Sequence, residues 1–146
     1  MPRKLEPGKV INGTWGKMFF SGIEIFELQR AEAVVIPVRD TLNFVQMLDE
    51  YEKLSGLRGT GSFTVYKVNS FGIREIVEAW KKGIDPHVSI VFQTNDPDNG
   101  GVETIALNDC WFQDFPIVNI EVKKYIQRDF RFNFAPRSVE FEDLID

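Results

Sequence analysis

The sequence contains a single histidine and a single cysteine, the side chains best suited to acid–base and nucleophilic chemistry near neutral pH. His87 follows Pro86 at the start of a strand-like run, and no nucleophile or metal ligand lies at an informative spacing from it. Cys110 precedes Trp111 and Phe112, a setting typical of a small apolar core residue. We therefore expect neither residue to be catalytic.

Two further stretches resemble ligand-binding loops but lack residues that such loops need. "NDPDNGG" places Asp96 and Asp98 as the first ligands of an EF-hand loop, but Gly100 and Leu107 occupy later ligand positions. "RGTGS" lacks the lysine and the following helix of a phosphate-binding loop. We predict a hairpin turn for the first stretch, and no catalytic, metal-binding or cofactor-binding site.

Length and composition indicate one packed domain over residues 1–146. The chain is 43% hydrophobic and contains 13 phenylalanines, enough to form its own core. It has no apolar run of the roughly 18 residues that span a membrane, and its N-terminus lacks the apolar segment of a signal peptide. We therefore expect a protein that is cytosolic when made and has no stable membrane association.

The charge is acidic overall and unevenly distributed. The 17 basic and 22 acidic residues give a net charge of −5, whereas proteins that grip nucleic acid show a clustered basic excess. Basic residues gather near the N-terminus and acidic residues near the C-terminus: Arg3, Lys4 and Lys9, against Glu140, Glu142, Asp143 and Asp146. An acidic tail is usually just solvated, and the alternative is electrostatic matching between copies of the chain.

Alternating apolar and polar residues predict an antiparallel sheet. The clearest runs are 88–92, 118–122 and 130–134, and each has one apolar and one polar face. An N-terminal hairpin is predicted to turn at Ser21-Gly22, with its second strand continuing through Val35. About seven such runs predict a small β-sandwich or barrel. Such a barrel could alternatively be a binding module for an apolar ligand or peptide.

One amphipathic helix is predicted over about residues 70–82. Asn69 or Ser70 can cap its start, and Gly83 can end it. Its apolar stripe, predicted to pack in the core against the sheet, consists of Ile73, Ile76, Val77 and Trp80.

The stretch 37–56 fits two structures. Phe44, Leu48 and Tyr51 have helical spacing, whereas Val38, Leu42 and Phe44 also share one face of a strand. The spacing alone favours the helix.

Several stretches, in order, resemble the tail tube proteins of the PBSX-like family of contractile-tailed phages and their defective relatives. They are "NGTWGKMFFSGIEIFEL", "GTGSFTVYKVNS", "WKKGIDPHVSIVFQTND" and "ETIALNDCWF". The resemblance covers nearly the whole chain. Its best joint signature is "GTG-x-x-T-x-Y-K-V" followed by a helix and "KKG-x-DP".

The resemblance implies a structural subunit of a virion tail, or of a phage-tail-like particle. Copies would close a hexameric ring through their sheets, and stacked rings would form a conduit for DNA ejection or membrane puncture inside a contractile sheath. The implied partners are further copies of the chain, the sheath protein, the baseplate tube-initiator protein and the tape-measure protein. DNA would pass through only as non-specific cargo, and assembly would take place in the cytoplasm of the bacterial host.

The resemblance also implies an extended loop that reaches the neighbouring ring, at about residues 37–56. It therefore favours an extended arm over the helix, between an N-terminal arm at about 1–12 and a C-terminal tail at about 136–146. The predicted anchors of the extended loop on another subunit are Leu42, Phe44, Met47 and Tyr51.

The polar faces of the last predicted strands are candidates for the channel wall, because a DNA conduit must not bind its cargo. The predicted lumen-facing residues are Asn119, Glu121, Lys123, Gln127, Asp129, Arg131 and Asn133. The alternative is that these residues face bulk water, as one side of most antiparallel sheets does.

Overall fold

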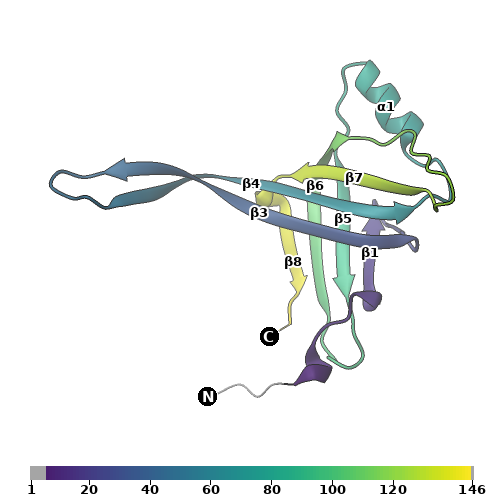
Figure 1. Cartoon of the computed structure of the whole chain (residues 1–146), viewed down its shortest axis with the longest axis horizontal. Helices are drawn as coiled ribbons and strands as arrows, with labels where there is room; N and C mark the ends of the chain where they lie inside the picture. Colours follow the sequence, from purple (N-terminus) through teal and green to yellow (C-terminus); the bar gives the residue numbers. More distant parts are fainter. Residues whose placement is uncertain (1–5, 146) are drawn as a thin grey trace.

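Eight strands form one antiparallel sheet in the computed structural model, which describes residues 6–145 (Figure 1). Seven follow the order β2-β1-β5-β6-β7-β4-β3, and β8 pairs with β6. The strands are β1 Gly16–Phe20, β2 Ile23–Glu24, β3 Leu28–Asn43, β4 Glu50–Tyr66, β5 Val88–Thr94, β6 Glu103–Asp114, β7 Gln127–Phe134 and β8 Val139–Asp143. The helix α1 spans Ile73–Lys81, and short 3-10 turns span Pro7–Lys9, Gly13–Trp15 and Pro136–Ser138.

Strand β6 joins two layers of this sheet. Its first part pairs with β5 and β8, and its last part, from Cys110 to Asp114, pairs with β7. In Figure 1 the strands β1, β5 and β6 run across β7, β4 and β3, so the two layers cross at a large angle. The predicted fold, mainly antiparallel β with one helix, is confirmed.

The core between the layers is rich in phenylalanine. Phe130, Phe132 and Phe134 of β7 are at most 2% exposed, and the ring of Phe63 stacks on that of Phe130 with centroids 4.7 Å apart. Met18 of β1 and further apolar residues of β5 and β6 close the other side. The alternation of residues 130–134 therefore separates a buried apolar face of β7 from a polar face, as the sequence predicted.

The two longest strands, β3 and β4, continue beyond the body as a two-stranded arm (Figure 1). Strand β4 pairs with β7 only from Gly59 to Tyr66, whereas its pairing with β3 extends outward to Asn43 and Glu50. At about 3.4 Å per residue the arm projects about 25 Å. The helix that spacing favoured for 37–56 is wrong, because residues 37–43 of β3 pair with residues 50–57 of β4 in a cross-strand ladder. The stretch is extended, as a hydrogen-bonded hairpin rather than a loop.

Helix α1 lies at one end of the sheet rather than over its face (Figure 1). Its N-cap is Gly72, with a φ of 81°, and not Asn69 or Ser70. The side chain of Asn69 instead accepts a hydrogen bond from the backbone N–H of Phe71 at 3.1 Å. Gly83, with a φ of 78°, follows the last turn, as expected for a helix end.

The four residues predicted for the core face of α1 differ in burial. Ile76 is buried, and Trp80 packs partly buried against the core cluster. Ile73 and Val77 are half-buried. The helix therefore covers one end of the core with only part of its apolar stripe, so fewer of its residues are buried than the sequence predicted.

Residues 118–122, predicted to be a strand, lie in a loop that covers 115–126. Val118, Ile120 and Val122 are 72–84% exposed, so the prediction of a buried face is wrong. Despite their alternation, these residues pair with no strand of the sheet. The backbone instead turns, with the Lys124 N–H bonded to the Glu121 carbonyl and Lys123 at a φ of 63°.

Within residues 6–145, the segments near the two termini are more ordered than the sequence predicted. Of the predicted C-terminal tail 136–146, residues 139–143 form β8 in the sheet. Of the predicted N-terminal arm 1–12, residues 1–5 lie outside the described residues, and Lys9 exchanges hydrogen bonds with Asn99. Nowhere in residues 6–145 does a helix have both the length and the apolar character of a membrane span.

Candidate functional site

His87 and Cys110, the residues best suited to chemistry, are kept apart by strand alternation. The His87 Nδ1 atom lies 2.5 Å from Asp109 Oδ1, and the imidazole stacks on Trp111 with ring centroids 5.2 Å apart. Asp109 and Trp111 flank Cys110 on β6, so the histidine contacts one face of the strand and the thiol points to the other. Sequence reasoning missed the contact between His87 and Asp109, because it depends on the pairing of β5 with β6.

The thiol of Cys110 is fully buried in the core. Burial, together with the negative charge of Asp109, raises the pKa of Cys110 to about 12. The neutral thiol therefore predominates at physiological pH, and a neutral buried thiol is a poor nucleophile.

Asp96, in the candidate calcium loop, is a structural residue. Its carboxylate accepts hydrogen bonds from the backbone N–H groups of Asn12 at 2.8 Å and Asp98 at 2.9 Å. The side chain is buried and ties the segment before β1 to the turn between β5 and β6. Among residues 6–145, no three His, Cys, Asp or Glu side chains are grouped as a metal site would require.

The exposed face of β7 and β4 is a continuous polar surface, opposite the phenylalanine core. Asp129 accepts a hydrogen bond from the Thr64 hydroxyl at 2.6 Å. Asn133 accepts one from Gln113 at 2.9 Å. Arg131 lies 4.0 Å from the carboxylate of Asp114. We call this the polar face; of the predicted lumen-facing residues it contains Gln127, Asp129, Arg131 and Asn133.

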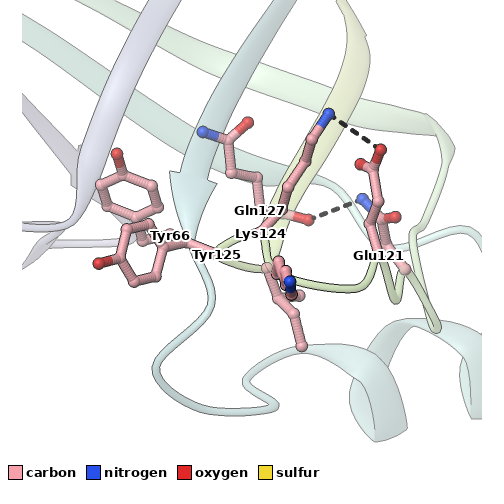
Figure 2. Close-up of a pocket in the computed structure, with 8 residues that line it drawn as sticks. Tyr66, Glu121, Lys124, Tyr125 and Gln127 are labelled. Carbon is pink, nitrogen blue, oxygen red and sulfur yellow. Dashed lines mark hydrogen bonds and ion pairs between the residues drawn. The ribbon is translucent and has the colours of Figure 1, made fainter.

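The remaining predicted lumen-facing residues, Asn119, Glu121 and Lys123, belong to the 115–126 loop (Figure 2). They line a separate pocket of about 410 Å³ next to Tyr66 and Gln127. Glu121 forms an ion pair with Lys124 at 3.0 Å, and the Asn119 side chain donates to the Gln127 carbonyl at 3.2 Å. The structure thus divides the predicted wall into two surfaces, joined at Gln127.

The end of the arm has one apolar and one polar face. Leu42 lies directly opposite Tyr51, and the Phe44 ring packs edge-on against Tyr51 at 5.7 Å. The next pair along the ladder, Asn43 and Glu50, projects to the other side. The predicted anchors Leu42, Phe44, Met47 and Tyr51 are 37–52% exposed. Three of the four therefore form one cluster, and Met47 lies in the turn beside it.

The side of the arm that carries Leu42 and Tyr51 continues the polar face of the body. Val34 is paired with Thr60, and Thr60 is paired with Asn133, so all three project to the same side of the sheet. Along that side, Val34, Ile36 and Val38 are 39–46% exposed. The surface thus changes from polar to mixed apolar and charged where the arm leaves the body, because Arg58 lies opposite Ile36 and the Asp40–Lys53 pair lies between Val38 and Leu42.

An open groove of about 1150 Å³ lies between β3 and the layer formed by β1, β5, β6 and β8. Its apolar lining includes Phe26, Leu28, Phe92, Ile105, Val139 and Phe141. Phe26 and Phe141 are 83% and 62% exposed. Sequence reasoning missed the groove, because strands far apart in the sequence form it.

The chain is thus a crossed two-layer β sheet with a projecting arm and an open groove. The chain matches the family described as phage tail tube protein over residues 3–141, and it therefore belongs to that family. It is similar to the phage-like element PBSX protein XkdM of Bacillus subtilis (strain 168), with 29% identity over 119 residues that cover 81% of each chain. The family predicted from the sequence is confirmed.

Solved structures show the same fold. A chain of the PVC sheath–tube complex, an extracellular contractile injection system in its extended state, superposes with a TM-score of 0.64 at 6% identity, over 92% of both chains. The SPP1 tail tube superposes with a TM-score of 0.65 at 13% identity, over 93% of this chain and 81% of the other. These likenesses confirm the tail tube type of β fold.

Proposed function

We propose that this chain is a non-catalytic building block that assembles with copies of itself into the hollow tube of a phage tail or phage-tail-like particle. In this proposal, hexameric rings stack inside a contractile sheath and meet baseplate and tape-measure proteins at the tube ends. Membership of the tail tube family and the likeness to a chain of a sheath–tube complex support it.

The observation that carries the proposal is the large exposed surface of the single chain. A compact monomer of 16.8 kDa exposes about 7,700 Å². This chain exposes 10909 Å², roughly 3,000 Å² more. Permanent protein interfaces commonly bury about 2,000–5,000 Å². The arm, the groove and the exposed apolar residues of the 115–126 loop contribute to this excess surface. Such an excess is expected of a subunit that buries surface against other copies.

The polar face is the part of the surface that we assign to the channel wall. Its residues carry both signs of charge, and a wall without basic excess lets DNA pass without binding it. We assign the 115–126 loop to contacts with other subunits at the end of the body, because its apolar side chains are exposed.

Electron microscopy of the purified protein over a range of concentrations tests the proposal. We expect rings or hollow tubes at high concentration, with sixfold symmetry in end views. A folded chain that stays monomeric by sedimentation at every concentration, with no rings in the microscope, would contradict it.

A further inference from the structure

Arg128 departs from the pattern of the strand that carries it. It shares the core side of β7 with Phe130, Phe132 and Phe134, and it is only 3% exposed. Among residues 6–145 no carboxylate lies within ion-pair distance of it, and its Nε atom has no hydrogen-bond partner. An arginine buried without a counter-ion carries a cost in desolvation. The core therefore contains a charge that packing alone does not require.

Aromatic rings surround the guanidinium where a counter-ion would be expected. Its Cζ atom lies 5.1 Å, 5.4 Å and 4.8 Å from the ring centroids of Phe71, Phe115 and Phe130. The faces of aromatic rings attract cations, and more strongly where water is excluded. Burial nevertheless lowers the pKa of Arg128 below its ordinary value. An arginine keeps its proton despite such a shift, so the rings surround a charged group.

These rings belong to three different parts of the fold. Phe130 is in β7, Phe71 precedes α1, and Phe115 begins the 115–126 loop. Arg128 also donates a hydrogen bond from Nη2 to the carbonyl oxygen of Phe71 at 3.0 Å. The guanidinium thus contacts both the segment that leads into α1 and the start of the loop.

The helix and the loop also meet directly, at the residue that begins α1. A Cβ atom on Gly72 would lie 2.8 Å from Cζ of Phe115, so the ring packs against bare backbone there. Figure 1 shows α1 and the 115–126 loop at the same end of the body. Of the nine residues of α1 only Ile76 is buried, and a helix of this length is marginally stable on its own. The position of α1 therefore depends on the contacts at its start.

We propose that Arg128 is a positioning residue that couples α1 to the 115–126 loop, so that the two move as one unit at the end of the sheet. A shift of either Phe71 or Phe115 changes the surroundings of the same buried charge. A partner that binds and orders the loop therefore orders α1 as well, and the coupling free energy is the same in the other direction. The consequence for assembly rests on the proposed function, which assigns the loop to contacts with other subunits.

The alternative is that Arg128 only fills space in the core. A space-filling side chain needs no charge, and methionine is a comparable unbranched side chain that adapts to irregular gaps. Replacement of buried ionic groups by apolar side chains of similar volume is often neutral or stabilising. If Arg128 only fills space, Arg128→Met leaves α1 and the loop as they are. If Arg128 couples them, the global stability is kept while both become mobile.

Local mobility in the free subunit tests the inference. Amide hydrogen exchange followed by mass spectrometry reports the opening of α1, and the rate of tryptic cleavage after Lys123 or Lys124 reports the opening of the loop. Arg128→Met removes the guanidinium. The matched control, Arg137→Met, makes the same substitution at an exposed position outside both elements. Urea unfolding of each variant gives the global stability.

We expect Arg128→Met to unfold at the wild-type urea concentration or higher. Exchange in α1 and cleavage in the loop should both be at least about tenfold faster, whereas Arg137→Met should match the wild type in all three measurements. Wild-type mobility of either α1 or the loop in Arg128→Met would overturn the coupling. A lower urea midpoint with faster exchange over the whole chain would also overturn it, because Arg128 would then only support the core.

A second variant tests the coupling from the side of the loop. Phe115→Leu removes the ring contact with Arg128 and should speed exchange in α1 at least about threefold in the wild-type background. Added to Arg128→Met it should have a much smaller effect, because that contact is already lost. Equal fold-changes in both backgrounds would overturn the role of Arg128. Failure of the wild-type chain to form rings or tubes would instead overturn the proposed function and leave this coupling, which is measured in the free subunit, intact.

Discussion

The ring of Phe132 lies against the backbone of Gly61, on the neighbouring strand. A Cβ atom on Gly61 would lie 2.5 Å from Cζ of Phe132 and 2.6 Å from the carbonyl oxygen of Glu32. Gly59 has the same relationship to Phe134. The two glycines of the "GTG" signature thus leave room for the aromatic side chains of β7.

Gly61→Ala should destabilise the subunit by about 1–3 kcal/mol, because the added methyl group forces Phe132 or the backbone to move. The matched control is Gly56→Ala in the arm, where the nearest atom to the new Cβ is 3.8 Å away. We expect the control to change the free energy of unfolding by less than about 1 kcal/mol. Urea unfolding of the free subunit measures both, and equal effects would contradict the packing described.

Phe130→Ala and Trp80→Ala should differ in cost, because their burial differs. Phe130 is fully buried among Phe63, Phe115 and the Arg128 guanidinium, so its truncation should cost about 3–5 kcal/mol. Trp80 is only partly buried, and its truncation also removes one hydrogen bond to Asp85. We therefore expect a loss of about 2 kcal/mol in the free energy of unfolding. Thermal and urea unfolding give the ranking; a larger loss at Trp80 would place the helix deeper in the core than described.

The two faces of the arm should differ in their effect on assembly. Leu42→Ser with Tyr51→Ser removes one apolar cross-strand pair, and we expect folded subunits that no longer form long tubes. Asn43→Ser with Glu50→Ser changes the adjacent pair on the opposite face and should leave tube length nearly unchanged. Electron microscopy measures tube lengths, and similar losses in both variants would mean that the apolar face is not an anchor.

Charge on the polar face should affect the passage of DNA. Asp129→Lys with Asn133→Lys adds three positive charges per subunit on β7 and should slow ejection from particles that deliver DNA, most strongly at low salt. Asn119→Lys with Glu121→Lys adds the same charge on the 115–126 loop and should leave the rate close to wild type. Ejection kinetics of equally well assembled particles measure the effect. Equal rates for both variants would remove the polar face from the DNA path.

The buried thiol should make stability fall at alkaline pH. Cys110 has a pKa of about 12 in the folded chain, above the ordinary value of 9.0, so the folded state keeps a proton that the unfolded state releases. The stabilising contribution is fully present below about pH 9 and is lost as the pH rises toward 12. Cys110→Ala should weaken this dependence between pH 9 and pH 10.5 in urea unfolding. An unchanged slope would contradict the effect of burial.

The sequence predicted those elements whose patterns describe local burial. Phe130, Phe132 and Phe134 alternate with polar residues and form β7, and the stripe around Ile76 forms α1. Alternation at Val118, Ile120 and Val122 is equally regular, yet these residues lie in a loop. A strand needs a free edge to pair with as well as a pattern, and the availability of that edge depends on the whole sheet.

The groove and the division of the polar residues could not be predicted for the same reason. Phe26, Phe92 and Phe141 lie in distant parts of the chain, and only the sheet order brings them together. The predicted channel wall is divided because Asn119 lies in the 115–126 loop and Asp129 lies in β7, although the sequence pattern predicts a strand for both. The prediction of an extended arm rested on the family resemblance, because the spacing of residues 37–56 alone favoured a helix.

The continuity of β4 from the arm into the body also has a mechanical consequence. The strand that carries Tyr51 in the arm continues into the body, where it pairs with β7 from Gly59 to Tyr66. A pull along the arm therefore acts parallel to these strands and loads their hydrogen bonds together, in shear, because ladder bonds run perpendicular to the strands. Peeling would break them one at a time. Tension applied at the tip is thus shared across the sheet, so an arm bound to another molecule would resist being pulled out of the body.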